Sequence, residues 1–501
     1  MRTSGILFPV FSLPGKYGIG CFSEEAYKFV DFLKEAKQTY WQILPLGPTG
    51  YGDSPYQSFS TFAGNPYLIS LEDLISQGLL TKEECDAVDF GDGKEVDYGK
   101  LYTGRKVLLR KACQRSGHKE TEAFKIFQKE NAFWLKDYAL FMAVKDAHGG
   151  AGASEWEPDI RGYEPAAVQE WSEKLQDEIG FYEYQQFEFF RQWKKLKTYA
   201  ASQGISIIGD IPIYVSADSS DFWAHRDLFQ LDERGRIRMI AGVPPDGFSA
   251  TGQVWGNPLY NWALHKETGY DWWIRRIAKC KELYDVIRID HFRGFDEYFA
   301  IPADADTAAS GHWEKGPGTD LFDAIEAALG KTPIIAEDLG YVTDTVRQLV
   351  RDTGFPNMKV LEFAFDSRDS TGAMEYLPYR FKNNCVVYTG THDNETLRGW
   401  IDSILPVERQ QVREYLDVRS EDPQEIVEKM IIAAFSSVAD CCIIPMQDYL
   451  GLDNSARTNQ PSTNGTNWKW RVNKEDLNDA LVARIARLTE LYGRFEESQD
   501  K

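Results

Sequence analysis

Eight short apolar runs recur along this chain, and most of them are separated by segments with helical periodicity. Each run is rich in β-formers and ends in polar residues or in Gly and Pro, as buried parallel strands do. The runs span residues 41–48, 66–71, 205–215, 286–290, 333–340, 360–366, 385–393 and 441–448. Between two runs, residues 343–354 read as a helix that Thr343 or Asp344 can cap and Gly354 can end. Strands alternating with helices form right-handed parallel units, and eight such units favour a closed α/β barrel, the (β/α)8 or TIM barrel.

Two long stretches interrupt this alternation. Residues 71–204 far exceed one crossover and are rich in helix formers, so we expect a large, mostly helical insertion. Residues 216–284 contain many aromatic residues together with Gly and Pro, which predicts an irregular, loop-rich insertion over the active site. No repeat, low-complexity tract or flexible linker is apparent, so residues 1–501 are predicted to form one elaborated catalytic barrel.

The charge balance narrows the range of partners. A formal net charge of −21 and a pI near 4.9 disfavour a nucleic-acid backbone or an anionic membrane surface. The N-terminus has too many Gly and Pro for a signal peptide, and no segment reaches membrane-spanning length, so we expect a cytoplasmic protein. The seven Cys form no CxxC pair and no His-flanked pattern, so they are predicted to be reduced thiols without a metal site.

Charged side chains end several of the apolar runs. In a parallel barrel these positions converge at the carboxyl ends of the strands, where active sites form. The set comprises Asp210, Arg288, Asp290, Glu337, Asp366, His392 and Asp393. Helix capping can explain any single Asp, but it does not explain a Glu at 337, an Arg inside an apolar strand or a His beside an Asp. The joint pattern therefore indicates a functional site.

Glycosidic bond chemistry needs such a carboxylate cluster. One carboxylate must be ionised to attack the sugar, and a second must be protonated to donate to the leaving oxygen. Arg288 lies two residues before Asp290 on the same strand face, so we expect its charge to hold Asp290 ionised. Glu337 is expected to be more enclosed and to keep its proton. The 14 Trp and 25 Tyr fit a sugar ligand, although most of them must belong to the core.

Six ordered motifs resemble those of the 4-alpha-glucanotransferase family. They are "YGDSPYQSFSTFAGNPYLI" (51–69), "GDIPIYV" (209–215), "GVPPDGFSATGQVWGNPLYNW" (242–262), "RIDHFRG" (288–294), "AEDLG" (336–340) and "TGTHDNET" (389–396). This family, also called amylomaltase or disproportionating enzyme and glycoside hydrolase family 77, belongs to the alpha-amylase-like clan. The resemblance implies a barrel that lacks a C-terminal β-sandwich, needs no cofactor and acts on alpha-1,4-glucans and maltooligosaccharides.

The resemblance also implies roles for individual residues. Asp290 matches the nucleophile, Glu337 the general acid/base and Asp393 the third carboxylate of the family. The positions that match substrate-binding residues are Tyr56, Asp210, Trp255, Arg288 and His392, together with Asp246, Gln253 and Asn257 on the loop over the cleft. Tyr51 matches a position implicated in a second glucan site. Asp366, which only its place at a strand end suggests, is added to the predicted substrate-binding set.

Together these features predict a retaining transferase. It would move a segment of an alpha-1,4-glucan to the 4-hydroxyl of glucose or another maltodextrin through a covalent glucanosyl-enzyme. The residue chemistry alone establishes only a retaining glycosidase, so an alpha-amylase-like hydrolase stays open as an alternative. A catalytically dead glucan-binding protein is the non-enzyme alternative, although all three carboxylates are present.

Overall fold

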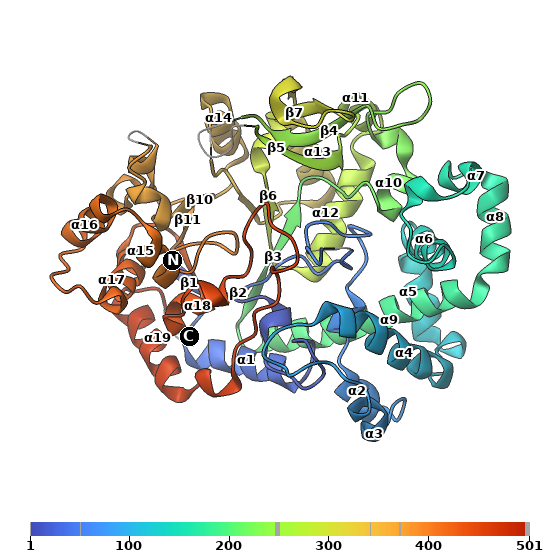
Figure 1. Cartoon of the computed structure of the whole chain (residues 1–501), viewed down its shortest axis with the longest axis horizontal. Coiled ribbons are helices and arrows are strands. Elements are labelled where there is room, and N and C mark those ends of the chain that lie inside the picture. Colours follow the sequence, from blue (N-terminus) through green and yellow to red (C-terminus); the bar gives the residue numbers. More distant parts are fainter. Residues whose placement is uncertain (1, 51, 246–250, 341, 370–371, 496–501) are drawn as a thin grey trace.

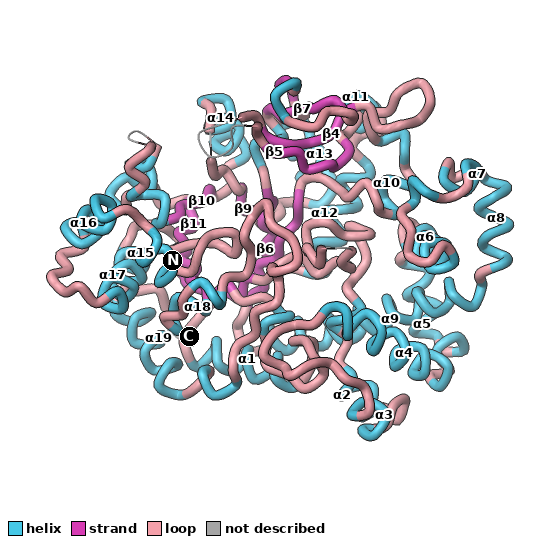
Figure 2. The backbone as a smooth tube through the Cα atoms, in the orientation of Figure 1, coloured by secondary structure: helices cyan, strands magenta, loops and turns pink. Residues whose placement is uncertain are grey.

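The computed structural model describes residues 2–50, 52–245, 251–340, 342–369 and 372–495. Eight parallel strands close into a barrel in the order β1-β2-β3-β6-β9-β10-β11-β12, with β12 pairing back to β1. They gather near the centre of the molecule, where Figure 2 draws strands in magenta. The barrel strands are β1 (Thr3–Leu7), β2 (Tyr40–Gln42), β3 (Ser206–Pro212), β6 (Val286–Asp290), β9 (Ile334–Ala336), β10 (Asn357–Val360), β11 (Cys385–Tyr388) and β12 (Cys441–Pro445). The predicted (β/α)8 class is confirmed.

One predicted strand was wrong, and a second, 360–366, shares only Val360 with the observed β10. Residues 66–71 form the 3-10 helix Pro66–Leu68 and the start of α2, because Asn65 and Ser70 act as caps: their side chains accept backbone N–H groups at 2.9 and 3.2 Å. The missing barrel strand is β1, which the sequence did not predict. β1 contains Gly5, where a Cβ would lie 2.6 Å from the Cβ of Tyr40 on β2. A glycine lowers the strand signal, yet here it allows two strands to approach closely.

Helices surround the barrel and form a lobe beside it. They are α1 (Glu24–Glu35), α2 (Leu71–Ser76), α3 (Lys82–Asp86), α4 (Tyr98–Arg115), α5 (Glu122–Glu130), α6 (Leu135–Ala147), α7 (Pro158–Arg161), α8 (Pro165–Lys174), α9 (Gln176–Ser202), α10 (Ser220–Ala224), α11 (Trp262–Glu267), α12 (Asp271–Leu283), α13 (Thr319–Leu329), α14 (Asp344–Thr353), α15 (Leu397–Ser403), α16 (Pro406–Tyr415), α17 (Pro423–Ser436), α18 (Met446–Leu450) and α19 (Asp479–Leu491). In α14, Thr343 caps the start and Gly354 ends the helix with φ 69°, as predicted. Within the described ranges, none of these helices is both long and apolar enough to cross a membrane.

The stretch 71–204 contains the helices α2 to α9, which form the lobe on the right of Figure 1. Its last helix, α9, is 27 residues long and connects the lobe to β3. Two buried glutamines of α9 hold the segment after β2. Gln186 bonds to both the N–H and the C=O of Gly64, at 2.7 and 2.9 Å, and Gln192 does the same to Ser70, at 2.7 and 3.4 Å. The lobe therefore fixes a loop that belongs to the barrel.

The stretch 216–284 is more ordered than the prediction of an irregular insertion. It contains α10, α11, α12 and the strands β4 (Met239–Val243) and β5 (Gln253–Pro258). With β7 (Glu297–Pro302) and β8 (His312–Lys315) these strands make a four-stranded antiparallel sheet, β5-β4-β7-β8. Figure 2 shows this second sheet above the barrel. The sequence did not reveal it because its members lie on both sides of β6 along the chain.

Candidate active site

Strand β6 carries two charged residues on one face, Arg288 and Asp290, which are two positions apart. Arg288 is 2% exposed, and strand register places it beside Asp210, its pairing partner on β3. Its guanidinium contacts the Asp210 carboxylate at 2.6 Å and the Asp290 carboxylate at 3.0 Å. One buried cation therefore bridges two carboxylates on neighbouring strands.

Tyr56 adds a third partner to this group. Its hydroxyl donates to Oδ2 of Asp210 at 2.9 Å, and its ring stacks on His392 with 5.1 Å between ring centroids. Burial, and then the negative charge of Asp210, raise the pKa of Tyr56 well above its ordinary value. The phenol therefore stays protonated and can donate this bond throughout the working pH range.

Glu337 follows β9 directly, and two backbone amides hold its carboxyl group. The N–H of His291 donates to Oε2 at 2.6 Å, and the N–H of Leu339 donates to Oε1 at 2.7 Å. Ile289 pairs with Ala336 across β6 and β9, so Asp290 and Glu337 are the next residues along these paired strands. Neighbouring strands lie about 4.8 Å apart, close to the roughly 5–5.5 Å between the two carboxyl groups of retaining glycosidases.

Asp393 lies in the loop after β11, and the chain near the C-terminus holds it. Nδ2 of Asn459 donates to Oδ1 of Asp393 at 2.6 Å, and Arg457 donates to its carbonyl oxygen at 2.6 Å. His392 contacts Oδ2 of Asp393 at 3.3 Å. The sequence did not predict Arg457 and Asn459, since they lie in a polar loop without a motif of its own. Their only signal was their position after the last barrel strand.

The two facing carboxyl groups have different proton affinities. Burial raises the pKa of Asp290 to about 6; the charge of Arg288 opposes this rise, whereas Asp210 and Asp393 add to it. Burial, and then the charge of Asp290, raise the pKa of Glu337 to about 8 against the effects of Arg288 and the two amides. Near neutral pH Asp290 is therefore mostly ionised and Glu337 mostly protonated.

The sequence also predicted an ionised Asp290 and a protonated Glu337, but the physical cause for Asp290 differs in part. Arg288 was expected to hold Asp290 ionised, and its charge does oppose protonation, but burial outweighs this attraction and raises the pKa of Asp290 overall. Arg288 also shares its charge with Asp210. The site can thus supply an anion and an acid to the same acetal. Over the part of the chain that the structure describes, no group of three or more His, Cys, Asp or Glu could hold a metal ion.

Strand β5 carries three residues that the sequence predicted to bind substrate. Gln253 and Trp255 lie close to the site, whereas Asn257 makes structural contacts. Trp255 meets the ring of His291 edge-on at 4.8 Å and donates its indole N–H to Gln253 at 3.0 Å. Asn257 is 5% exposed, and its amide donates to the carbonyl of Val215 at 2.8 Å and accepts from Gln57 at 3.2 Å. Asn257 thus ties β5 to the loops after β2 and β3. Asp246 and Tyr51 lie outside the described residues.

Asp366 does not join the cluster. Strand β10 ends at Val360, and the 3-10 helix Leu361–Phe365 carries the chain away before Asp366 is reached. Its two carboxylate oxygens pair with Arg368, each at 2.8 Å. This pairing lowers the pKa of Asp366, unlike the raised values of Asp290 and Glu337. The structure thus gives Asp366 the surroundings of an ion pair near the surface.

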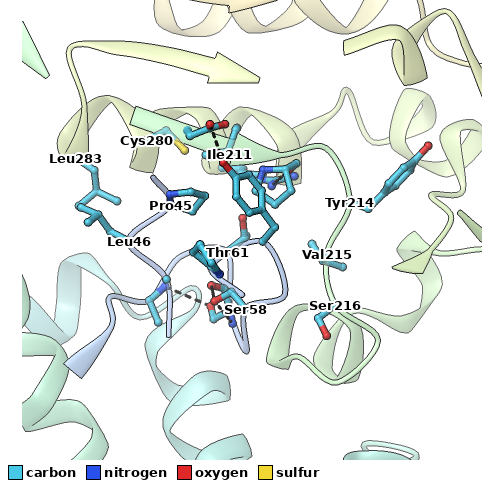
Figure 3. Close-up of a pocket in the computed structure, with 18 of the residues that line it drawn as sticks. Pro45, Leu46, Ser58, Thr61, Ile211, Tyr214, Val215, Ser216, Cys280 and Leu283 are labelled. Atoms are coloured by element: carbon cyan, nitrogen blue, oxygen red, sulfur yellow. Dashed lines mark hydrogen bonds between the residues drawn. The ribbon is translucent and has the colours of Figure 1, made fainter. Parts of the chain in front are cut away.

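A small cavity of about 40 Å³ lies behind the Tyr56–Asp210 pair. Figure 3 shows side chains of β3, of α12 and of the segments after β2 and β3 around it, among them Ile211, Cys280, Leu283, Pro45, Leu46, Thr61, Tyr214 and Val215. It has room for a few waters, each of which needs roughly 10–15 Å³, and none for a sugar. The cavity therefore lies behind the site and is not an additional sugar subsite.

A much larger cavity of about 830 Å³ opens between the barrel and the helical lobe. Part of its wall comes from Pro48, Thr49, Gly50, Gly52 and Asp53, and α4, α6 and α9 supply most of the rest. Tyr98, Tyr102 and Tyr182 line it. It is therefore distinct from the carboxylate cluster, although both adjoin the loop after β2.

The chain is similar to known proteins over its whole length. A family model described as 4-alpha-glucanotransferase matches residues 8–477. A 4-alpha-glucanotransferase of Streptococcus pneumoniae is 47% identical over 501 residues, covering 99% of this chain and 98% of the relative. One of Thermus thermophilus is 45% identical, covering 99% of both chains. The solved amylomaltase from Streptococcus agalactiae in complex with acarbose has a TM-score of 0.95 and 42% identity, covering 99% of this chain and 100% of that one.

The chain belongs to the 4-alpha-glucanotransferase family. As a 4-alpha-glucanotransferase it is an enzyme that transfers glucan segments, which decides between the alternatives that the residue chemistry left open. A hydrolase and a catalytically dead binding protein are both set aside. The retaining mechanism expected from the carboxylate pair is consistent with this family.

Proposed function

We propose that Asp290 is the nucleophile and Glu337 the general acid/base of a two-step glucan transfer. The observation that carries this assignment is the register of β6 and β9, which sets an ionised and a protonated carboxyl group side by side. An Oδ atom of Asp290 attacks the anomeric carbon while Glu337 gives its proton to the glycosidic oxygen. The carbon–oxygen bond breaks, the shorter sugar leaves, and the glucan remains as an ester of Asp290.

The second step reverses the proton transfer. Glu337, now ionised, takes the proton of the 4-hydroxyl of an incoming sugar, and that oxygen attacks the anomeric carbon and displaces Asp290. The His291 and Leu339 amides that contact Glu337 stabilise its ionised form, which this step requires. The acceptor is glucose or another maltodextrin. The alpha-1,4-glucan donor agrees with the acarbose complex of the amylomaltase from Streptococcus agalactiae.

The surrounding residues have supporting roles in this proposal. Asp393, held by Asn459, binds ring hydroxyls of the donor sugar, and His392 and Tyr56 lie beside it. Arg288 stabilises the charge of the nucleophile, and Asp210 holds the Arg288 guanidinium in place. Aromatic and amide groups of the 242–262 segment complete the sugar subsites, with Trp255 placed beside His291. Asp246 and Gln253 remain predicted sugar contacts of this segment.

The proposed donors and acceptors are neutral sugars, in keeping with a net charge of −21 that opposes nucleic-acid and anionic membrane partners. The seven free thiols suit the reducing cytoplasm, where we propose that the enzyme works. Fractionation of the native cell checks the location.

A second glucan site is proposed at position 51. The large cavity between barrel and lobe offers a place for a second sugar, because several tyrosines line it. Aromatic faces pack well on the apolar faces of pyranose rings. A Tyr51→Ala variant should lose activity on long amylose and keep it on maltotriose; equal loss on both would contradict a separate site.

The transfer itself is tested with purified enzyme and maltotriose. Transfer conserves the number of reducing ends, whereas hydrolysis adds one for every bond that is cleaved. We therefore expect longer maltodextrins and free glucose to form while total reducing ends stay almost constant. Reducing ends that rise as fast as the chain lengths redistribute would contradict acceptor transfer.

A further inference from the structure

His291, the residue directly after Asp290, has an unusual backbone conformation. Its φ and ψ are 56° and 47°, in the left-handed region that residues with a Cβ rarely adopt. The position is next to the proposed nucleophile and at the end of a barrel strand. Because left-handed residues are costly, those found near active sites are often retained for function.

The left-handed conformation has a direct geometric result. In an extended strand, successive N–H groups point to opposite sides, but a left-handed residue turns two successive N–H groups the same way. Here the N–H of His291 reaches the Glu337 carboxylate at 2.6 Å, and the N–H of Phe292 reaches the Glu337 carbonyl at 3.0 Å. Both amides thus converge on one residue, which an extended chain at 291 would not allow.

The imidazole of His291 has other neighbours. It meets Trp255 edge-on at 4.8 Å and lies 6.3 Å from the ring of Tyr214, so it packs against aromatic groups of the wall. Burial lowers the pKa of His291 to about 3, which leaves the ring neutral. The ring supports the turn by packing, while the backbone makes the contacts with Glu337.

We propose that His291 is a positioning residue for Glu337 and acts through its left-handed backbone and not through its imidazole. The proposal rests on the acid/base role of Glu337 under the proposed function. In this proposal the backbone amide of residue 291 fixes the Glu337 carboxyl group in the orientation for proton transfer. The same amide also has a share in stabilising the ionised form that accepts the proton of the incoming sugar.

Substitutions at 291 that differ in their tolerance of left-handed φ provide the test. Gly and Asn adopt this conformation readily, Ala less so and β-branched Val least. We expect kcat to fall by no more than about 3-fold in His291→Gly and His291→Asn, by about 10-fold in His291→Ala and by about 100-fold in His291→Val. Equal losses in Gly, Asn and Ala would show that the imidazole matters and would overturn the proposal, as would a Val variant as active as His291→Gly.

The pH profile of kcat/KM provides a second test, because a purely structural role of His291 would leave this profile unchanged. The groups that face Glu337 are Asp290 and Arg288 on β6 and Tyr376 at the end of the 3-10 helix Ala373–Tyr376, and none of them changes in the series. A weaker amide contact disfavours the ionised carboxylate, so the basic limb of kcat/KM should move to higher pH in the Ala and Val variants only. An unmoved limb in both would contradict the proposal.

Two controls keep the outcome clear. Asp417 also has a left-handed φ, 53°, but is exposed at the end of α16, so Asp417→Val should lower Tm and leave kcat unchanged. If His291→Val does not fold, the Gly and Ala variants decide: Ala well below Gly supports the proposal, and equality overturns it. Failure of the acid/base assignment is detected separately, because Glu337→Gln would then remain active on maltotriose whatever the His291 series shows.

Discussion

Two buried arginines at opposite ends of the barrel show how differently the fold uses the same charge. Arg288, near the carboxyl ends of the strands, pairs with the carboxylates of Asp210 and Asp290. Arg494, at the amino ends, is 1% exposed, and its guanidinium donates to five backbone carbonyls. These carbonyls belong to Thr3, Ala434, Phe435, Ser437 and Ala439.

The difference lies in what neutralises each cation. Peptide dipoles satisfy Arg494 and tie the first and last segments of the chain together, so its contribution is to stability. Carboxylates satisfy Arg288, and one of them, Asp290, is the proposed nucleophile. Charge at the catalytic end therefore serves chemistry, while charge at the other end closes the barrel.

The largest expected effect tests the catalytic end directly. Asp290→Asn and Glu337→Gln should each lower kcat by about 10⁴-fold or more, because they remove the nucleophile and the proton donor. The Tm should stay within a few degrees of the wild type. With α-glucosyl fluoride, whose leaving group needs little protonation, Glu337→Gln should still form the covalent ester and Asp290→Asn should not. Normal turnover of maltotriose by either variant would refute the assignment.

The comparison itself is tested by substituting each arginine with Met, which keeps much of the side-chain volume. Arg288→Met should lower kcat by about 10²–10³-fold and stability by about 3–5 kcal/mol, since Asp210 is left buried without its cation. Arg494→Met should lower stability by about 2–4 kcal/mol, because several carbonyls lose their donor, and leave kcat unchanged. Urea unfolding and maltotriose kinetics give both readings. A lower kcat in Arg494→Met would contradict the separate roles of the two arginines.

A smaller effect concerns pH. The value of kcat/KM should rise as Asp290 ionises near pH 6 and fall as Glu337 loses its proton near pH 8, by about tenfold per unit outside that window. The folded state holds the Glu337 proton more tightly than the unfolded state does. Its contribution to stability is therefore full below about pH 4.5 and is lost as pH rises towards 8. Between pH 5 and 8 the Tm of Glu337→Gln should fall less than that of wild type; equal slopes would contradict the raised pKa.

The smallest expected effect is at Asp366. Asp366→Asn removes a surface ion pair with Arg368, and such pairs contribute about 0–1 kcal/mol. We expect kcat and KM for maltotriose to change by less than about twofold. A tenfold rise in KM would return Asp366 to the substrate-binding set that the sequence predicted.

Much of the barrel could be read from the sequence because buried parallel strands are continuous apolar runs. Residues 286–290 were predicted with the bounds that β6 has, since Asp290 ends the run. β1 was not predicted because Gly5 lowers its strand signal. Residues 66–71 were misread because β-forming side chains also suit a short turn of helix between two capping residues.

The site was predictable to the extent that its residues end strands. Asp210, Arg288, Asp290 and Glu337 meet because strand register carries them to one end of the barrel. Asp366 lies apart from this group because five residues of 3-10 helix separate it from β10. The left-handed turn at His291 could not be read, since such turns usually carry Gly or Asn.

The paired glutamines of α9 have a consequence for how such an enzyme can change over time. Gln186 and Gln192 are six positions apart, and so are the two peptide groups that they grip, at Gly64 and Ser70. One residue added to the helix between them would turn the side-chain amide of Gln192 through about 100° and break its hydrogen bonds to Ser70. The lobe is thus free to gain or lose chain at its outer loops, while the length of this inner stretch is fixed by the barrel loop that it holds.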